Sequence, residues 1–105
     1  GAAKAVKELE KEQKSRATRM VRDSIDGALL DIATFYRDVM MVQSGSGEAI
    51  INTDMVDVIN TYAAKHPKHS TINKMSAIME ARTNLAHNAA PLLTCEALMC
   101  RLAKA

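Results

Sequence analysis

The last third of the chain, residues 78–102, places two helical patterns on either side of a corner. In the first pattern, residues such as Ile78 and Leu85 recur at helical intervals and share one face. That pattern stops at Asn88, a residue type that tolerates the left-handed conformation found at helix ends. Pro91 then suits the first turn of a new helix, because its φ is fixed and it lacks an N–H. The sequence therefore predicts a helix–corner–helix hairpin with a broad apolar face.

Composition extends this prediction to the whole chain. Hydrophobic residues make up 48% of the 105 residues, but aromatic residues only 3%, and there is no Trp. A core must therefore be built from Leu, Ile, Val, Ala and the seven Met, a mixture that favours helices over strands. A chain of this length forms one domain at most. We predict an all-α fold, a bundle of about four helices of which the first is long.

The first helix is predicted over residues 2–43, where only Gly27 opposes it, at a cost of about 1 kcal/mol. Its first part differs from the rest in charge. Residues 1–22 contain seven Lys and Arg against three Glu, a net charge of +4, whereas residues 23–105 contain seven against nine. We therefore divide the chain into a basic, charged helix or linker over 1–22 and a helical domain over 23–105. From residue 21 onward the apolar repeat continues for about six turns, which predicts the longest core helix.

A stripe of lysines on the basic part is a candidate contact for nucleic acid, because cations neutralise phosphates. The stripe consists of Lys4, Lys7, Lys11 and Lys14. Interleaved glutamates and the absence of aromatic residues in this part argue for the alternative, a solvated helix supported by pairs of opposite charge.

The middle of the chain predicts a loop and two further helices. Residues 44–47 are a Gly/Ser loop, and Glu48 follows where a phosphate-binding loop would need Lys and then Ser or Thr. Asn52 or Thr53 is expected to cap the second helix, and Pro67 to end it. Its expected buried face consists of Met55, Val56, Val58, Ile59, Tyr62 and Ala63.

The third helix is expected to begin with Ser70 or Thr71 as its cap. Its expected apolar face consists of Ile72, Met75, Ile78, Met79 and Leu85. Arg82 lies at the edge of this face. It is either a buried, hydrogen-bonding arginine that locks the hairpin or an interface residue, and the pattern leaves both open.

No residue pattern points to catalysis, a cofactor or a metal. Cys95 and Cys100 would lie about 140° apart on one helix, so we expect two buried free thiols. The three histidines are too few for a structural zinc site. Asp23 and Asp26 are interpreted as surface charges. No stretch has the roughly 20 apolar residues that span a bilayer, and we expect a cytoplasmic chain with no membrane contact.

Two segments resemble a known family. The pattern A-R-x-x-L-x-x-N followed by x-x-P-L-L-x-x-E-A-L-M, over residues 81–99, resembles the end of the DNA polymerase III delta-prime subunit of bacterial clamp loaders. Residues 13–40, QKSRATRMVRDSIDGALLDIATFYRDVM, resemble the actinobacterial form of that subunit. One departure is Ala90, where the family often has Asn, and it removes a helix cap expected to stabilise by about 1 kcal/mol.

The resemblance implies a non-catalytic collar domain over residues 23–105. In this family such domains hold the subunits together for ATP-driven loading of the sliding clamp in DNA replication, and the ATPase modules lie elsewhere. It implies the gamma/tau and delta subunits as partners; the isolated chain could also self-associate. The alternative is a stand-alone helical protein that binds nucleic acid through its basic N-terminal helix.

For a subunit interface, the candidate residues are Arg37, Arg82, Leu92, Leu93, Glu96, Leu98, Met99 and Leu102. The apolar members could face either the bundle or a neighbour. Because nearly every predicted helix has a wide apolar face, we expect an exposed apolar patch of several hundred Å², roughly the size that marks an interface.

Overall fold

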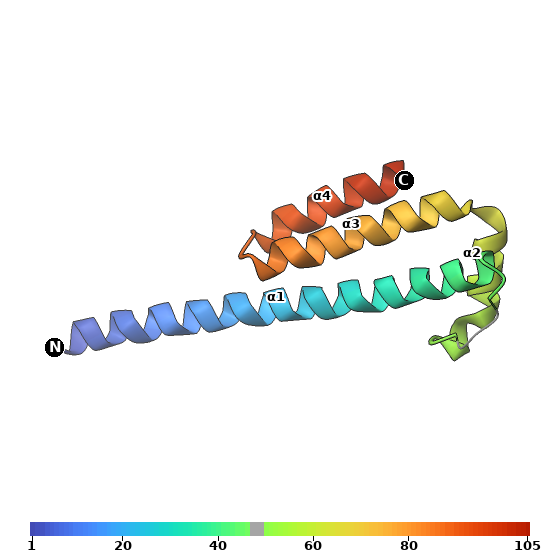
Figure 1. Ribbon diagram of the computed structural model, residues 1–105. Helices are drawn as coiled ribbons and strands as arrows, with labels where there is room; N and C mark the ends of the chain where they lie inside the picture. Colours follow the sequence, from blue (N-terminus) through green and yellow to red (C-terminus); the bar gives the residue numbers. More distant parts are fainter. Residues whose placement is uncertain (47–49) are drawn as a thin grey trace.

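The structure is a computed structural model that describes residues 1–46 and 50–105. These residues form four α-helices and a single 3₁₀ turn, without strands, which confirms the all-α prediction (Figure 1). In chain order, the elements are α1 (Ala2–Gln43), η1 (Thr53–Met55), α2 (Val56–Lys65), α3 (Lys68–Ala86) and α4 (Pro91–Lys104).

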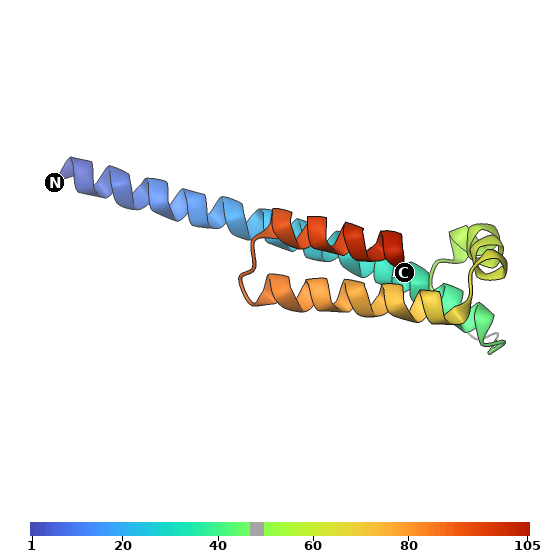
Figure 2. The ribbon, with the colours of Figure 1, turned by 90° about the horizontal axis from the view of Figure 1, so that it is seen from above.

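The long helix α1 organises the arrangement. Helix α3 runs antiparallel to α1 along the C-terminal half of α1, and α4 packs on α3 and runs parallel to α1. Helix α2 crosses the end of α1 (Figures 1 and 2). The N-terminal part of α1 projects beyond the α3–α4 hairpin, which makes the molecule 66 Å long but only 27 Å by 17 Å across. Residues 1–21 are exposed, so the predicted boundary after residue 22 falls where one continuous helix enters the bundle.

The core lies where α1, α3 and α4 meet. Its buried residues are Leu29, Ala33, Ala77, Ile78, Ala81, Leu85 and Leu98. Three of these are alanines, which lets α3 approach both neighbouring helices closely. Because α1 and α4 cover the alanine side of α3, two residues predicted on the buried face, Ile72 and Met79, point outward and are 43% and 46% exposed. That part of the predicted face is wrong.

The predicted face of α2 is also too broad. Ile59 is completely buried, but Val58 is 53% exposed and Met55 37%. Helix α2 packs mainly against α1, so only a narrow stripe of it is covered. The end of α1 also fixes the end of α2, because the side-chain amide of Gln43 donates a hydrogen bond to the carbonyl of His66 at 2.7 Å.

Two predicted helix caps are not formed. Helix α3 begins at Lys68 with Pro67 as its N-cap, and the predicted caps Ser70 and Thr71 are buried in its first turn. Pro67 has an extended backbone whose carbonyl accepts the N–H groups of both residues at 3.1 and 3.4 Å, so the helix starts directly after the proline. Neither Asn52 nor Thr53 caps α2, which has Met55 as its N-cap and no side-chain cap bond.

Both long helices end in a left-handed residue. In α3 the residue is Asn88, with φ of +66°; its N–H donates to Leu85 and the next N–H to Asn84, which forms the Schellman arrangement. In α1 the residue is Gly45, with φ of +70° and the same hydrogen-bond pattern. Gly47 and Glu48, on which part of the loop prediction depended, lie outside the described residues.

Helix α4 begins as predicted with Pro91 in its first turn, but Ala90 supplies no side-chain cap. Replacing Ala90 by Asn is expected to stabilise the fold by about 1 kcal/mol, because the amide oxygen accepts an N–H of the first turn. Urea unfolding followed by circular dichroism measures the change. Ala90→Val, which has no acceptor, is the control and should bring no gain. An equal effect of both variants would contradict the capping argument.

Candidate interaction surface

Helix α4 presents large apolar side chains that the bundle leaves uncovered. Leu92, Leu93 and Met99 are 73%, 67% and 70% exposed. Leu98, in contrast, belongs to the core, and Leu102 packs against it, so these two face the bundle rather than a neighbour. Glu96 is exposed. Of the predicted apolar interface residues of α4, Leu92, Leu93 and Met99 are therefore accessible to a partner in this fold.

Two shallow hollows flank α1 on one side. The first, of about 370 Å³, lies between α1 and the start of α4 and is lined by Val21 and Leu92 among others. The second, of about 470 Å³, lies between α1 and η1–α2 and includes Ile32, Met55 and Val58.

Five large, exposed apolar side chains line the two hollows, and Met99 shares a face of α4 with one of them. Val21 and Ile32 are eleven residues apart, about three helical turns, so they share a face of α1. Leu92 and Met99 are related in the same way on α4, seven residues and about two turns apart. We call these four residues, together with Met55 and Val58, the apolar strip. Each of the six is at least 37% exposed.

Arg82, another interface candidate, is engaged within the bundle. Its Nε donates to Oδ1 of Asp26 at 2.8 Å, and an Nη group donates to Oδ2 at 3.3 Å. The side chain is 27% exposed. Of the two interpretations left open by the sequence, the hydrogen-bonding one fits, but the helix that Arg82 joins to α3 is α1, not α4.

Asp26 is therefore more than the surface charge expected from the sequence. Its hydrogen bond from Arg82 lowers its pKa, and the same contact raises the pKa of Arg82. A signal was present, since Asp26 lies three residues before the core residue Leu29 and so close to the same face of α1. The partner, 56 positions away, could not be read from that spacing.

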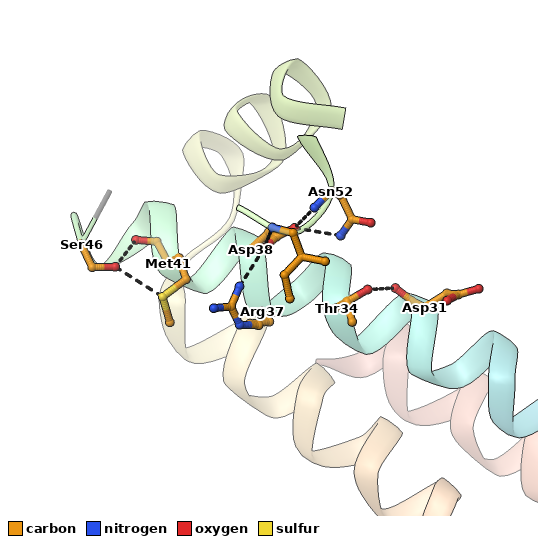
Figure 3. Close-up of polar contacts among 8 residues, drawn as sticks. Asp31, Thr34, Arg37, Asp38, Met41, Ser46 and Asn52 are labelled. Atoms are coloured by element: carbon orange, nitrogen blue, oxygen red, sulfur yellow. Dashed lines mark hydrogen bonds and ion pairs between the residues drawn. The ribbon is translucent and has the colours of Figure 1, made fainter. Parts of the chain in front are cut away.

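No pattern in the sequence marks Asp38, which is completely buried. Its carboxylate accepts hydrogen bonds from the backbone N–H groups of Ile51 and Asn52 at 2.9 and 2.8 Å, and from the Asn52 side-chain amide at 2.8 Å (Figure 3). It also forms an ion pair with the interface candidate Arg37 at 3.1 Å. Asp38 thus holds the chain where it returns toward α2, through both the backbone and the side chain of Asn52.

The pKa of Asp38 reflects opposing effects. Burial, the largest single effect, raises it, but the hydrogen bonds from Ile51 and Asn52 together with the charge of Arg37 outweigh burial and lower the pKa overall. Both Asp26 and Asp38 therefore have pKa values below the ordinary carboxyl value of 3.8.

A depressed carboxyl pKa predicts how stability depends on pH. The stabilisation is fully present above the unfolded-state pKa and is lost as the pH falls through the lower folded-state pKa. We therefore expect the free energy of unfolding to stay level from about pH 7 to 5 with respect to these groups and to fall below about pH 4. Urea unfolding at each pH measures it. Asp38→Asn should show a shallower acid decline, and an unchanged decline would contradict this assignment.

All three aromatic rings gather where α1 meets α2. Phe35, Tyr36 and Tyr62 contact one another edge-to-face, with ring centroids 5.4–5.8 Å apart, and His66 stacks on Tyr62. Lys74 of α3 donates to the Tyr62 hydroxyl at 2.5 Å. Burial raises the pKa of Tyr36 to about 12, and the nearby Tyr62 adds to the increase. This cluster ties α2 and α3 to the end of α1.

Comparisons with known proteins give no match to this chain. No protein-family model, curated protein or solved structure matches this chain. The resemblance to the delta-prime subunit therefore depends on the two sequence segments alone.

The lysine stripe lies on the projecting part of α1. Lys4, Lys7, Lys11 and Lys14 are exposed, and among the described residues no ion pair engages them, whereas the nearby Arg16 pairs with Glu12 at 3.4 Å. Spacings of three and four residues put these lysines in line with the core-facing side of α1 further along the chain.

The two cysteines and the possible metal ligands lie as follows. Cys95 is half-buried and Cys100 exposed, both as free thiols, so the expectation that both are buried is wrong. Cys100 is exposed because α4 is covered on one side only. Within residues 1–46 and 50–105, no three His, Cys, Asp or Glu side chains gather closely enough to hold a metal ion. The helices in the same residues are too short or too polar to cross a bilayer.

Proposed function

We propose that this chain is a non-catalytic assembly domain, the collar domain of a bacterial clamp-loader delta-prime subunit. It holds neighbouring subunits together while the clamp loader uses ATP to place the sliding clamp on DNA. The apolar strip carries the proposal, because Leu92 and Met99 are 73% and 70% exposed, whereas Leu98 of the same helix is buried. The two sequence segments that resemble the delta-prime subunit supply the family.

The energetics favour association through this strip. Complete burial of a Leu, Met or Val side chain contributes about 1.5–3 kcal/mol. Because the six residues of the apolar strip are 37–73% exposed, each contributes roughly that share of this amount. The six together contribute about 5–10 kcal/mol, which is of the same order as the about 4–15 kcal/mol that association costs in lost freedom. A partner surface must therefore cover α1, α4 and η1–α2 together.

The experiment is sedimentation velocity of the purified chain with the gamma/tau and delta subunits from the same source. We expect a stable complex that Leu92→Asp weakens at least tenfold, since the variant would bury a charge in an apolar contact. Leu93→Asp is the matched control: it is a similarly exposed leucine, but about 100° away around α4 and outside the apolar strip. A chain that associates with neither subunit would rule out the proposal.

A second candidate, nucleic-acid binding, is favoured by one observation, the four lysines without ion pairs. If they contact phosphates, the logarithm of the affinity for duplex DNA should fall with the logarithm of salt concentration with a slope of about −3.6. Replacing all four by Gln should abolish binding, whereas replacing Lys65, Lys68 and Lys104 should not. Binding without salt dependence, or equal losses in both variants, would exclude this candidate.

A further inference from the structure

The geometry points to a second docking site, in the groove between α1 and α3, which receives the carboxylate of an acidic side chain from a neighbouring protein. The groove encloses about 380 Å³, and Arg22, Asp26, Met79 and Arg82 contribute to its lining. It is separate from the apolar strip, because Asp26 lies about 140° around α1 from Val21.

Arg22 lines this groove, and its Nε is buried and makes no hydrogen bond within residues 1–46 and 50–105, although Asp26 lies one turn away on the same helix. Asp26 is instead engaged by Arg82, which occupies both of its carboxylate oxygens. An unpaired, buried guanidinium N–H is unfavourable, so a rotation of the Arg22 side chain that brings this N–H to an incoming acceptor relieves a cost already present in the folded chain.

The surroundings specify the class of ligand. A guanidinium matches a planar carboxylate in two parallel hydrogen bonds. Asp23 and Asp26 also line the groove, so its net charge with the two arginines is zero, which favours a singly charged carboxylate over a doubly charged phosphate. Met79, 46% exposed, offers an apolar contact beside the charges. Arginine and methionine in this combination are typical of protein interfaces.

The two surfaces serve different neighbours. A subunit in a ring contacts one neighbour on each side through different faces. The apolar strip supplies one such face. The groove lined by Arg22 and Arg82, which we call the arginine groove, supplies the other. In taking the ligand to be a protein, this inference rests on the proposed function, but it concerns a different part of the surface.

The test follows the N–H signal of the Arg22 Nε in the ¹⁵N-labelled chain by NMR. The probe is the peptide acetyl-Leu-Glu-Leu-amide, and its control is acetyl-Leu-Gln-Leu-amide. We expect a saturable shift of the Arg22 signal and of the Met79 methyl signal with the Glu peptide, and an at least fivefold weaker response to the Gln peptide. Inorganic phosphate should bind more weakly than the Glu peptide.

Variants complete the test. Arg22→Lys should abolish the response at the Met79 methyl group, whereas Arg19→Lys, at an exposed arginine on the same helix, should preserve it. Equal responses to both peptides, a stronger response to phosphate, or no response would each overturn the carboxylate site. If the carboxylate site fails but the chain still associates through Leu92, the proposed function stands. If the chain binds the peptide but associates with no subunit, only the proposed function is contradicted.

Discussion

Ile78→Ala is expected to lower the free energy of unfolding by about 2–5 kcal/mol. Ile78 is completely buried in the core between α1, α3 and α4, and the variant loses apolar contacts while leaving a cavity. A domain of this size is stabilised by only about 5–15 kcal/mol, so a large part of its stability would disappear. The midpoint of urea unfolding, followed by circular dichroism, measures the loss.

Met79→Ala is the matched control for this prediction. It removes a comparable volume from the next residue of the same helix, and both residues belong to the apolar face predicted from the sequence. Because Met79 is 46% exposed, its removal should cost less than about 1 kcal/mol. Similar losses for both variants would mean that the core does not lie on the alanine side of α3.

Asp38→Ala is the second change with a large expected effect, about 2–5 kcal/mol, since two backbone donors lose their acceptor. The variant leaves the backbone N–H groups of Ile51 and Asn52 without their acceptor in a part of the structure where the carboxylate was completely buried. It also removes one ion-pair contact of Arg37. Asp38→Asn keeps the size of the side chain but replaces one acceptor oxygen by a donor, so it should also destabilise.

Hydrogen exchange distinguishes this effect from general loosening. The amides of Ile51 and Asn52 should lose protection in Asp38→Asn, while those of the core helix α3 change only as much as global stability does. Asp31→Asn, at an exposed position on the same helix, is the control and should change stability by less than about 0.5 kcal/mol. Unaltered protection at residues 51 and 52 would contradict the anchoring role of Asp38.

Local rules determined most of the secondary structure. The extent of α1, the corner at Asn88 and the start of α4 at Pro91 follow from residues whose backbone preferences act within one or two turns. The helix starts were less predictable, since Ser70 and Thr71 are good caps by type. Pro67 began α3 before them, because its extended backbone places a carbonyl where the first helical N–H groups can reach it.

The candidate surface was only partly predictable for the same reason. Periodicity indicates that Leu92, Leu98 and Met99 are apolar residues of one helix, but which of them is covered depends on where α1 and α3 approach it. The Asp26–Arg82 pair joins residues 56 positions apart, and no local pattern specifies such a partner.

What the sequence by itself determined is therefore an all-α chain with one long helix and a C-terminal hairpin, because backbone preference and apolar spacing act over a few residues. The tertiary structure alone decided which side of each helix is buried, that Asp38 anchors the segment before α2, and that the apolar strip and the arginine groove lie on different sides of α1. These features depend on contacts between distant segments, and their free energy appears only when the helices pack together.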